Sequence, residues 1–350
     1  LSGSAKLAAN SLSYSLEVKG DFNIDASATY DPNQNNTRFT GDTDAQFSVE
    51  GTITSNLYNW VIAKDNSTLT VAGANGNVTV RNDLQIVSGT LNDNGHTITA
   101  HGDLFNSGIH TGTGKMLLSG ATATRTIGGN GNGVWGNMEL NESSGISTSL
   151  TANQTVAGDF VFTAGLMNLD TYALLLQGSM MPSNITDYSD THMFVTSGSD
   201  SGGGLIRNIT QNGNWLFPVG CSRDVVRYTP ALATLTDWTD EGYLQVNPVA
   251  SELPLLSQTS TEPALQYYWR IRQSNFDAKP NASFVFQYNA HDIVQDGDDS
   301  GYVPGKVAGA VRTNLASGVN TTDKTITYHP AEPLSIAIYT AAYPSRFDGP

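Results

Sequence analysis

An acidic loop at residues 296–302 has the residue types and the spacing of a calcium-binding loop. Calcium prefers hard oxygen ligands, and a glycine at the sixth position permits the sharp turn that such loops need. The predicted ligands are the side chains of Asp296, Asp298 and Ser300 and the carbonyl oxygen of Tyr302. The twelfth position holds Val307 where a bidentate glutamate is usual, so a further ligand such as Asp292 has to come from outside the loop. The alternative interpretation is a solvated acidic turn. The sequence indicates no required cofactor, and calcium is the one candidate ligand ion.

The other residues that could perform chemistry are scattered along the chain. The six histidines show no metal-ligand spacing on a common element: His96, His101, His110, His192, His291 and His329. The single cysteine, Cys221, cannot form an intrachain disulfide, and no family signature of a catalytic thiol surrounds it. We therefore predict a buried thiol and no catalytic residues.

Acidic residues recur at equivalent positions of an internal repeat, namely Asp21, Asp83, Asp103 and Asp159. This recurrence is typical of corner residues, because a catalytic carboxylate pair would interrupt the repeat. The chain is therefore predicted not to be an enzyme. A groove lined by exposed aromatic residues would instead favour a carbohydrate-binding module or a β-helix polysaccharide lyase or hydrolase. The candidates for such a groove are Trp60, Trp135 and Tyr172.

Composition limits the class of protein. Charged residues make up 14% of the 350 residues, against about 25% in an average soluble protein, and Gly, Asn, Ser and Thr are abundant. The net charge is −15, and the 17 basic residues form no cluster, which argues against binding to nucleic acid phosphates. No stretch of 18 apolar residues is present, so the sequence predicts no membrane-spanning helix.

The elements that position these residues are short strands in a repeat. Residues 78–102 align without gaps with residues 154–178, and the pair Gly89 and Gly165 is among the identical positions. Three strands separated by Gly, Asn and Asp take roughly 20 residues, which is the span of one solenoid coil. The predicted inward column consists of Leu84, Ile86, Leu91, Ile98, Leu104 and Ile109.

The predicted fold class is therefore all-β, with a right-handed parallel β-helix over residues 1–180 followed by a β-sandwich domain over residues 181–350. At about 4.8 Å per coil, roughly eight or nine coils would form a rod about 40 Å long. An antiparallel sandwich is the alternative for the same short strands. In the second half the strands are longer and alternate between two faces, and Thr261–Tyr268 is the only segment in which a helical turn is considered.

Both halves resemble large surface and adhesin-like repeat proteins of the Bacteroidota, many of which leave the cell by type IX secretion. The resemblance lies in VSGTLNDNGHTITAHGDLFNSG and TAGLMNLDTYALLLQG in the first half, and in WLFPVG and LQYYWRIRQSNF in the second. It implies an extracellular, outer-surface location. No C-terminal sorting domain is recognisable, so we expect the full protein to continue beyond this sequence or to be cut at this end.

We therefore expect a non-catalytic structural and adhesive module of a larger bacterial cell-surface protein. Its expected partners are other cell-surface proteins, copies of itself and glycans, and not nucleic acid. Two alternatives stay open. The chain would be a subunit of a surface filament or layer if solenoid ends or sheet edges pair between copies. It would be a carbohydrate-binding module or a polysaccharide enzyme if a groove presents aromatic residues.

Overall fold

The computed structural model describes residues 1–9, 14–143, 146–200, 202–223, 225–294 and 298–348. The protein is nearly all-β, with 53% of residues in strands and 3% in helices, and it contains a β-solenoid of about 9 turns. Contacts divide it into two compact units. The first unit is Leu1–Leu166 with Leu176–Pro182, and the second is Met167–Leu175 with Ser183–Pro350. In the described residues no helix has the length and apolar character to cross a membrane.

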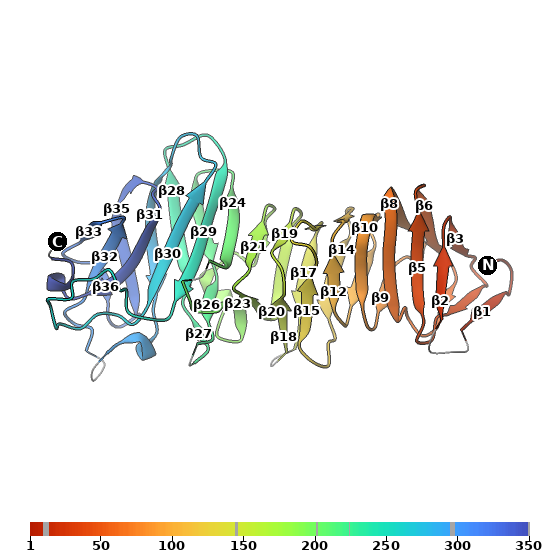
Figure 1. The fold of residues 1–350 in the computed structure, drawn as a ribbon, viewed down its shortest axis with the longest axis horizontal. Coiled ribbons are helices and arrows are strands. Elements are labelled where there is room, and N and C mark those ends of the chain that lie inside the picture. Colours follow the sequence, from red (N-terminus) through yellow and green to blue (C-terminus); the bar gives the residue numbers. More distant parts are fainter. Residues whose placement is uncertain (10–13, 144–145, 201, 224, 295–297, 349–350) are drawn as a thin grey trace. The chain divides into compact units, whose positions relative to one another are not determined.

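Each coil of the solenoid has three faces, and each face is a run of parallel strands that pair from coil to coil (Figure 1). The first face contains β2 (Ser15–Val18), β5 (Asn36–Gly41), the start of β8 (Asn59–Ala72), the start of β10 (Leu84–Asn92), β12 (Leu104–Asn106), β15 (Arg125–Gly128) and β18 (Ser147–Leu150). The second face contains β3 (Phe22–Ile24), β6 (Ala45–Val49), the ends of β8 and β10, β13 (Ile109–Thr111), β16 (Val134–Trp135) and β19 (Gln154–Val156).

The third face is made of two separate groups of strands. The first group is β1 (Lys6–Ala8), β4 (Thr29–Asp31) and β7 (Thr52–Ile53). The second group is β9 (Val78–Val80), β11 (Thr97–Ala100), β14 (Lys115–Ser119), β17 (Met138–Asn141), the start of β20 (Phe160–Asp170) and β22 (Met180–Met181). β20 also pairs with β18 of the first face. The chain therefore forms the predicted solenoid rather than an antiparallel sandwich in its first half.

The register shows why the repeat folds into coils. Leu84 pairs with Trp60 of the preceding coil and with Leu104 of the following coil, so inward side chains stack in columns. Two corners need a left-handed backbone and close approach, and glycine supplies both. Gly89 (φ 77°) lies between the first-face and second-face segments of β10, and Gly165 (φ 99°) follows the third-face segment of β20. A β-carbon on Gly165 would lie 2.9 Å from Cβ of Glu142.

The recurring aspartates tie each coil to the next. The Oδ1 atom of Asp21 accepts a hydrogen bond from the Gln46 amide at 2.8 Å, and that of Asp103 accepts one from the Thr126 amide at 2.7 Å. Asp159 accepts in the same way from Ser179 at 3.0 Å. The prediction that these residues occupy corners is confirmed.

The inward column is confirmed at five of its six positions: Leu84, Ile86, Leu91, Ile98 and Leu104 are buried. It is wrong at Ile109, whose side chain is 47% exposed. The register pairs Leu91 with His110, so the inward position of this coil belongs to His110, which is buried. Ile109 lies one residue earlier and therefore points to the opposite side of the strand.

The second unit contains two antiparallel sheets. One sheet joins β24 (Gly204–Ile209), β29 (Gly242–Val249), β30 (Tyr268–Ser274), β36 (Ala337–Ala342), β32 (Val303–Ala308) and β33 (Val311–Asn314), with β23 (His192–Thr196), β26 (Val219–Cys221) and β27 (Arg227–Tyr228) alongside. The other consists of β25 (Gly213–Phe217), β28 (Ala231–Thr236), β31 (Asn281–Gln287), β35 (Thr325–Pro333) and β34 (Val319–Asn320). The chain passes between the units three times, and one of these passages lies within β21 (Ala173–Leu176).

Aromatic side chains fill the space between these two sheets. The ring of Phe286 on β31 stacks at 4.8 Å from that of Trp269 on β30, and Phe284 lies 5.0 Å from Tyr339 on β36. The alternation of apolar residues on β31 therefore faces a sandwich core, as predicted. The segment Thr261–Tyr268, considered for a helical turn, forms none: it makes a bridge at Ala264 and then enters β30. Short 3-10 turns occur instead at Ile185–Asp187, Ala290–Asp292 and Pro344–Arg346.

Candidate functional site

The predicted calcium loop is only partly within the described residues, because Asp296 lies outside them. The Asp298 carboxylate is exposed and accepts a hydrogen bond from the Ser300 amide at 2.9 Å, while Tyr302 is buried. Asp299, which was not predicted as a ligand, is buried, and its Oδ2 atom binds the Lys324 ammonium at 2.8 Å and the Tyr288 hydroxyl at 2.5 Å. Over the described part of the chain, no group of three His, Cys, Asp or Glu residues is placed to hold a metal ion.

Calcium binding at this loop therefore stays a prediction. If the loop binds calcium, adding the ion raises the melting temperature of the protein, because a ligand that binds the folded state stabilises it by mass action. Differential scanning calorimetry with calcium and with a chelator measures this shift. The Asp298→Ala variant should lose it, and a melting temperature that ignores calcium would leave the loop as a solvated turn.

The predicted aromatic groove is not formed by the two tryptophans. Trp60 and Trp135 are fully buried inside the coils, and the Trp135 indole donates a hydrogen bond to Oε1 of Gln154 at 2.8 Å. Tyr172 is half-buried. The interior of a coil needs large side chains, and both tryptophans occupy inward positions of their strands. They serve as core residues and cannot stack on a saccharide.

A buried Asp–His pair lies inside the solenoid. The Nε2 atom of His110 is 3.1 Å from Oδ2 of Asp93, and the Gly136 amide donates a hydrogen bond to Nδ1 at 3.2 Å. The proton of the imidazole therefore lies on Nε2, facing the carboxylate. Burial raises the pKa of Asp93, but hydrogen bonds from His110 and the amides of Gly95 and Gly114 outweigh it, so that the pKa lies below its ordinary value.

A buried ion pair lies in the coils beyond this pair. The Arg125 guanidinium contacts the Glu142 carboxylate, and both side chains are inaccessible to solvent. Arg125 also donates to the carbonyl oxygens of Ala100 and Ser119, while Oε2 of Glu142 accepts the Ala121 amide at 3.3 Å. Burial lowers the pKa of Arg125 to about 10, so its guanidinium is charged at neutral pH. Both side chains join neighbouring coils.

Cys221 lies in a buried polar cluster of the second unit. Burial raises the pKa of the Cys221 thiol, which removes the thiolate that nucleophilic chemistry needs. The prediction of a buried, free thiol is confirmed. Close to it, the Tyr267 hydroxyl is 2.5 Å from that of Thr229, and the Arg227 guanidinium lies over the Tyr267 ring at 5.4 Å.

Arg227 and Asp292 complete this cluster as a buried ion pair, with Nε 2.9 Å from Oδ1. Burial raises the pKa of Asp292 to about 6, although the Arg227 charge opposes the shift. The folded state therefore holds the Asp292 proton more tightly than the unfolded chain does. Its contribution to stability is complete below the unfolded pKa near 3.8 and is lost as the pH rises through 6.

The Asp292→Asn variant is expected to remove this dependence. Between pH 4 and pH 6 the free energy of unfolding of the unaltered protein should fall, relative to that of the variant, by about 3 kcal/mol. Urea unfolding across this range measures the difference in slope. Asp277→Asn, at an exposed position, is the matched control and should leave the slope unchanged. Equal slopes for the protein and Asp292→Asn would contradict the assignment.

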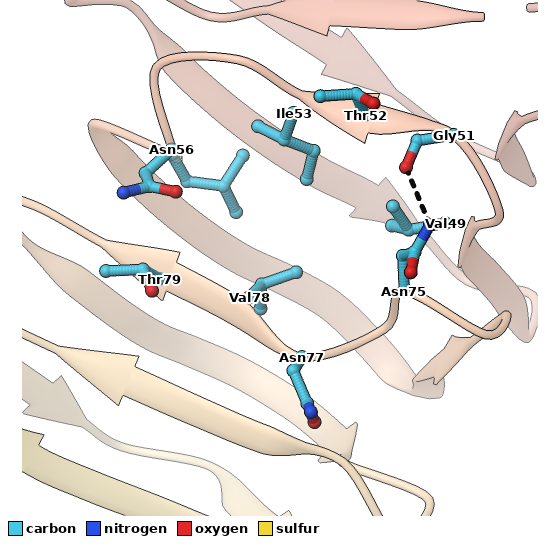
Figure 2. Close-up of a pocket in the computed structure, with 10 residues that line it drawn as sticks. Val49, Gly51, Thr52, Ile53, Asn56, Asn75, Asn77, Val78 and Thr79 are labelled. Atoms are coloured by element: carbon cyan, nitrogen blue, oxygen red, sulfur yellow. Dashed lines mark hydrogen bonds between the residues drawn. The ribbon is translucent and has the colours of Figure 1, made fainter. Parts of the chain in front are cut away.

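A groove opens where the third face is interrupted, between β7 and β9 (Figure 2). β7 pairs with β4 and β9 pairs with β11. At one end Nδ2 of Asn75 donates to the carbonyl oxygens of Glu50 and Gly51. At the other end the Leu57 amide donates to the Thr79 carbonyl at 2.9 Å. The groove between these two sets of hydrogen bonds has a volume of about 330 Å³.

The local sequence explains this interruption. Asn56 adopts a left-handed backbone (φ 55°), a conformation that asparagine tolerates better than most residues. The chain turns at this residue, and the next residue, Leu57, makes the hydrogen bond to Thr79 of β9. Asn56, Asn77, Thr52 and Thr79 surround the opening, above the apolar side chains of Ile53 and Val78 (Figure 2). Its ten lining residues include no ionisable side chain. The groove can exchange hydrogen bonds with a neutral polar ligand but holds no acid or base for catalysis.

The fold defines this chain as a β-solenoid repeat protein with a sandwich-like second unit. No protein-family model, curated protein or solved structure matches the chain.

Proposed function

We propose that this chain is an extracellular, non-catalytic structural and adhesive module of a larger bacterial cell-surface protein. The outer-surface location and the export by type IX secretion that the sequence resemblance implies are part of this proposal. The observation that carries it is the continuity of side-chain hydrogen bonds from coil to coil. Such continuity suits a stiff spacer that presents a surface, because each coil is stabilised by its neighbours.

One asparagine ladder illustrates this continuity. Nδ2 of Asn36 donates to Oγ of Ser15 at 3.1 Å, and Oδ1 of Asn36 accepts from Nδ2 of Asn59 at 2.7 Å. Oδ1 of Asn59 in turn accepts from Nδ2 of Asn82 at 2.8 Å. Inside the coils, the buried Lys64 ammonium donates to the carbonyl oxygens of Thr40, at 2.9 Å, and Lys19. The asparagine ladder joins four successive coils, and Lys64 joins three of them.

The proposed function is non-catalytic, and the contacts of the buried charged groups support this part of the proposal. Asp93, Arg125 and Glu142 bind partners within the solenoid, and Arg227 and Asp292 bind each other within the second unit. Each of these groups is buried. An acid, base or nucleophile has to reach a substrate, and these groups are separated from solvent by their own strands.

Immunogold electron microscopy of intact source cells tests the proposal. Antibodies against the chain should label the outside of unbroken cells, and protein extracted from the surface should appear as separate elongated particles. Label that is confined to broken cells would overturn the surface location. Regular polymers in the extract would favour the alternative function, a subunit of a surface filament or layer.

A further inference from the structure

The outer side of the first face carries a second shallow groove, of about 340 Å³, which we call the Phe105 groove. Its residues lie on successive coils at one register position. Gln85 pairs with Phe105, and Phe105 pairs with Gly128 of the next coil. The Phe105 side chain is 40% exposed. Val87 on β10 is exposed to the same extent, and Val61, which pairs with Gln85 in the preceding coil, is apolar but buried. Phe105 is the aromatic member of this outward apolar set.

Gly128 is the residue that pairs with Phe105 in the next coil. It has no side chain, so the next strand places none beside the Phe105 ring, although Gly128 is itself buried. A β-carbon at Gly128 would lie 2.6 Å from Oγ1 of Thr151, which borders the groove in the following coil. The groove therefore combines an open ring surface with a neighbouring depression.

Hydrogen-bonding groups border the ring on one side. Asp83 and Asp103 each precede the paired residues Leu84 and Leu104, so their carboxylates lie on neighbouring coils at the same register. One oxygen of Asp103 accepts the Thr126 amide at 2.7 Å. Burial, and then the charge of Asp103, raise the pKa of Asp83. This pair of like charges opposes folding, and it would be relieved by hydroxyl donors from a ligand.

We propose that the Phe105 groove binds a neutral saccharide, with one pyranose ring against the Phe105 ring and its hydroxyls donating to Asp83 and Asp103. The aromatic face attracts the positively polarised C–H groups of a sugar ring, while the carboxylates and the Gln85 amide fix its orientation. The two negative charges repel acidic sugars. The inference rests on the proposed adhesive function and names its ligand class.

Isothermal titration calorimetry of the full chain tests this inference. The probes are neutral cello-, manno- and xylo-oligosaccharides, with oligogalacturonate as the acidic comparison. At least one neutral probe should bind, and Phe105→Ala should weaken its binding by about tenfold or more, while Phe105→Tyr should retain it. Ile109→Ala, at a comparably exposed apolar residue on the neighbouring face, is the matched control and should bind as the unaltered protein does.

Three results would overturn the inference: no neutral probe binds, Phe105→Ala binds equally well, or oligogalacturonate binds as tightly as the neutral probes. Because Phe105 is exposed, its replacement should preserve the fold, which the melting temperature verifies. Surface labelling of cells does not depend on Phe105. The proposed function and the ligand class can therefore fail separately.

Discussion

Replacing Glu142 by glutamine is expected to lower the free energy of unfolding by about 3–5 kcal/mol. The substitution leaves the Arg125 guanidinium charged and buried without its carboxylate partner. The carbonyl oxygens of Ala100 and Ser119 continue to accept from it, but they carry no net charge. Urea unfolding, followed by circular dichroism, measures the loss.

Two further variants distinguish this charge effect from a packing effect. The double variant Arg125→Met/Glu142→Met removes both charges and should be much more stable than Glu142→Gln, because apolar residues of similar volume replace a buried ion pair at little cost. Glu139→Gln is the surface control. Glu139 lies 2.5 Å from the partly exposed Lys115 ammonium, and its loss should cost about 1 kcal/mol or less. A double variant as unstable as Glu142→Gln would contradict the interpretation.

Replacing Asp93 by alanine is expected to cost about 3 kcal/mol, because several buried donors lose their acceptor and each costs roughly 1–3 kcal/mol. Oδ1 accepts the amides of Gly95 at 2.9 Å and Gly114 at 2.7 Å, and Oδ2 faces His110. The pKa of Asp93 is lowered in the folded protein. Its contribution to stability is therefore present above the unfolded pKa near 3.8 and is lost as the pH falls through the lowered folded pKa.

Thermal unfolding of Asp93→Ala and of the unaltered protein from pH 7 down to pH 3 measures this effect. The difference in melting temperature should be large at pH 7 and should shrink below pH 4. Asp44→Ala is the control, since Asp44 also accepts an amide from the next coil, that of Thr68 at 2.8 Å, but is exposed. A difference that is independent of pH, or equal for the two variants, would refute the role given to Asp93.

The solenoid could be predicted from the sequence because its corners have strict chemical requirements. Gly89 and Gly165 occur at the same position of two repeats, and the left-handed backbone at both explains why. The alternation of Leu84 and Ile86 identifies their inward side. These signals are local. Each arises from a required backbone conformation or from the alternation of inward and outward residues along a strand.

The interior polar pairs could not be predicted because they depend on contacts between coils. Alternation alone permits either Ile109 or His110 to face inward, and hydrophobicity favours Ile109. The structure places His110 inside because Asp93, one coil earlier, supplies the acceptor that a buried imidazole needs. Arg125 and Glu142 likewise lie 17 residues apart, and neither has a local pattern that reveals the other.

The candidate sites show the same limit. The groove beside β7 depends on a single turn at Asn56, and the Phe105 groove depends on an absent side chain at Gly128 in another coil. Aromatic composition pointed to Trp60 and Trp135, but a narrow solenoid interior uses its largest side chains as core. The ring in the proposed groove is that of Phe105, which the sequence marks only as an apolar residue at an outward position.

The interruption between β7 and β9 has a mechanical consequence. Backbone hydrogen bonds in a solenoid run along its axis, so a pulling force along that axis acts on the coil interfaces in series and every interface bears the same load. At most interfaces that load is divided among three faces of paired strands, but here the third face contributes little more than the links at Asn75 and Leu57. Under tension we expect this interface to separate first, so that the coils on either side stay intact while the chain lengthens at one defined place.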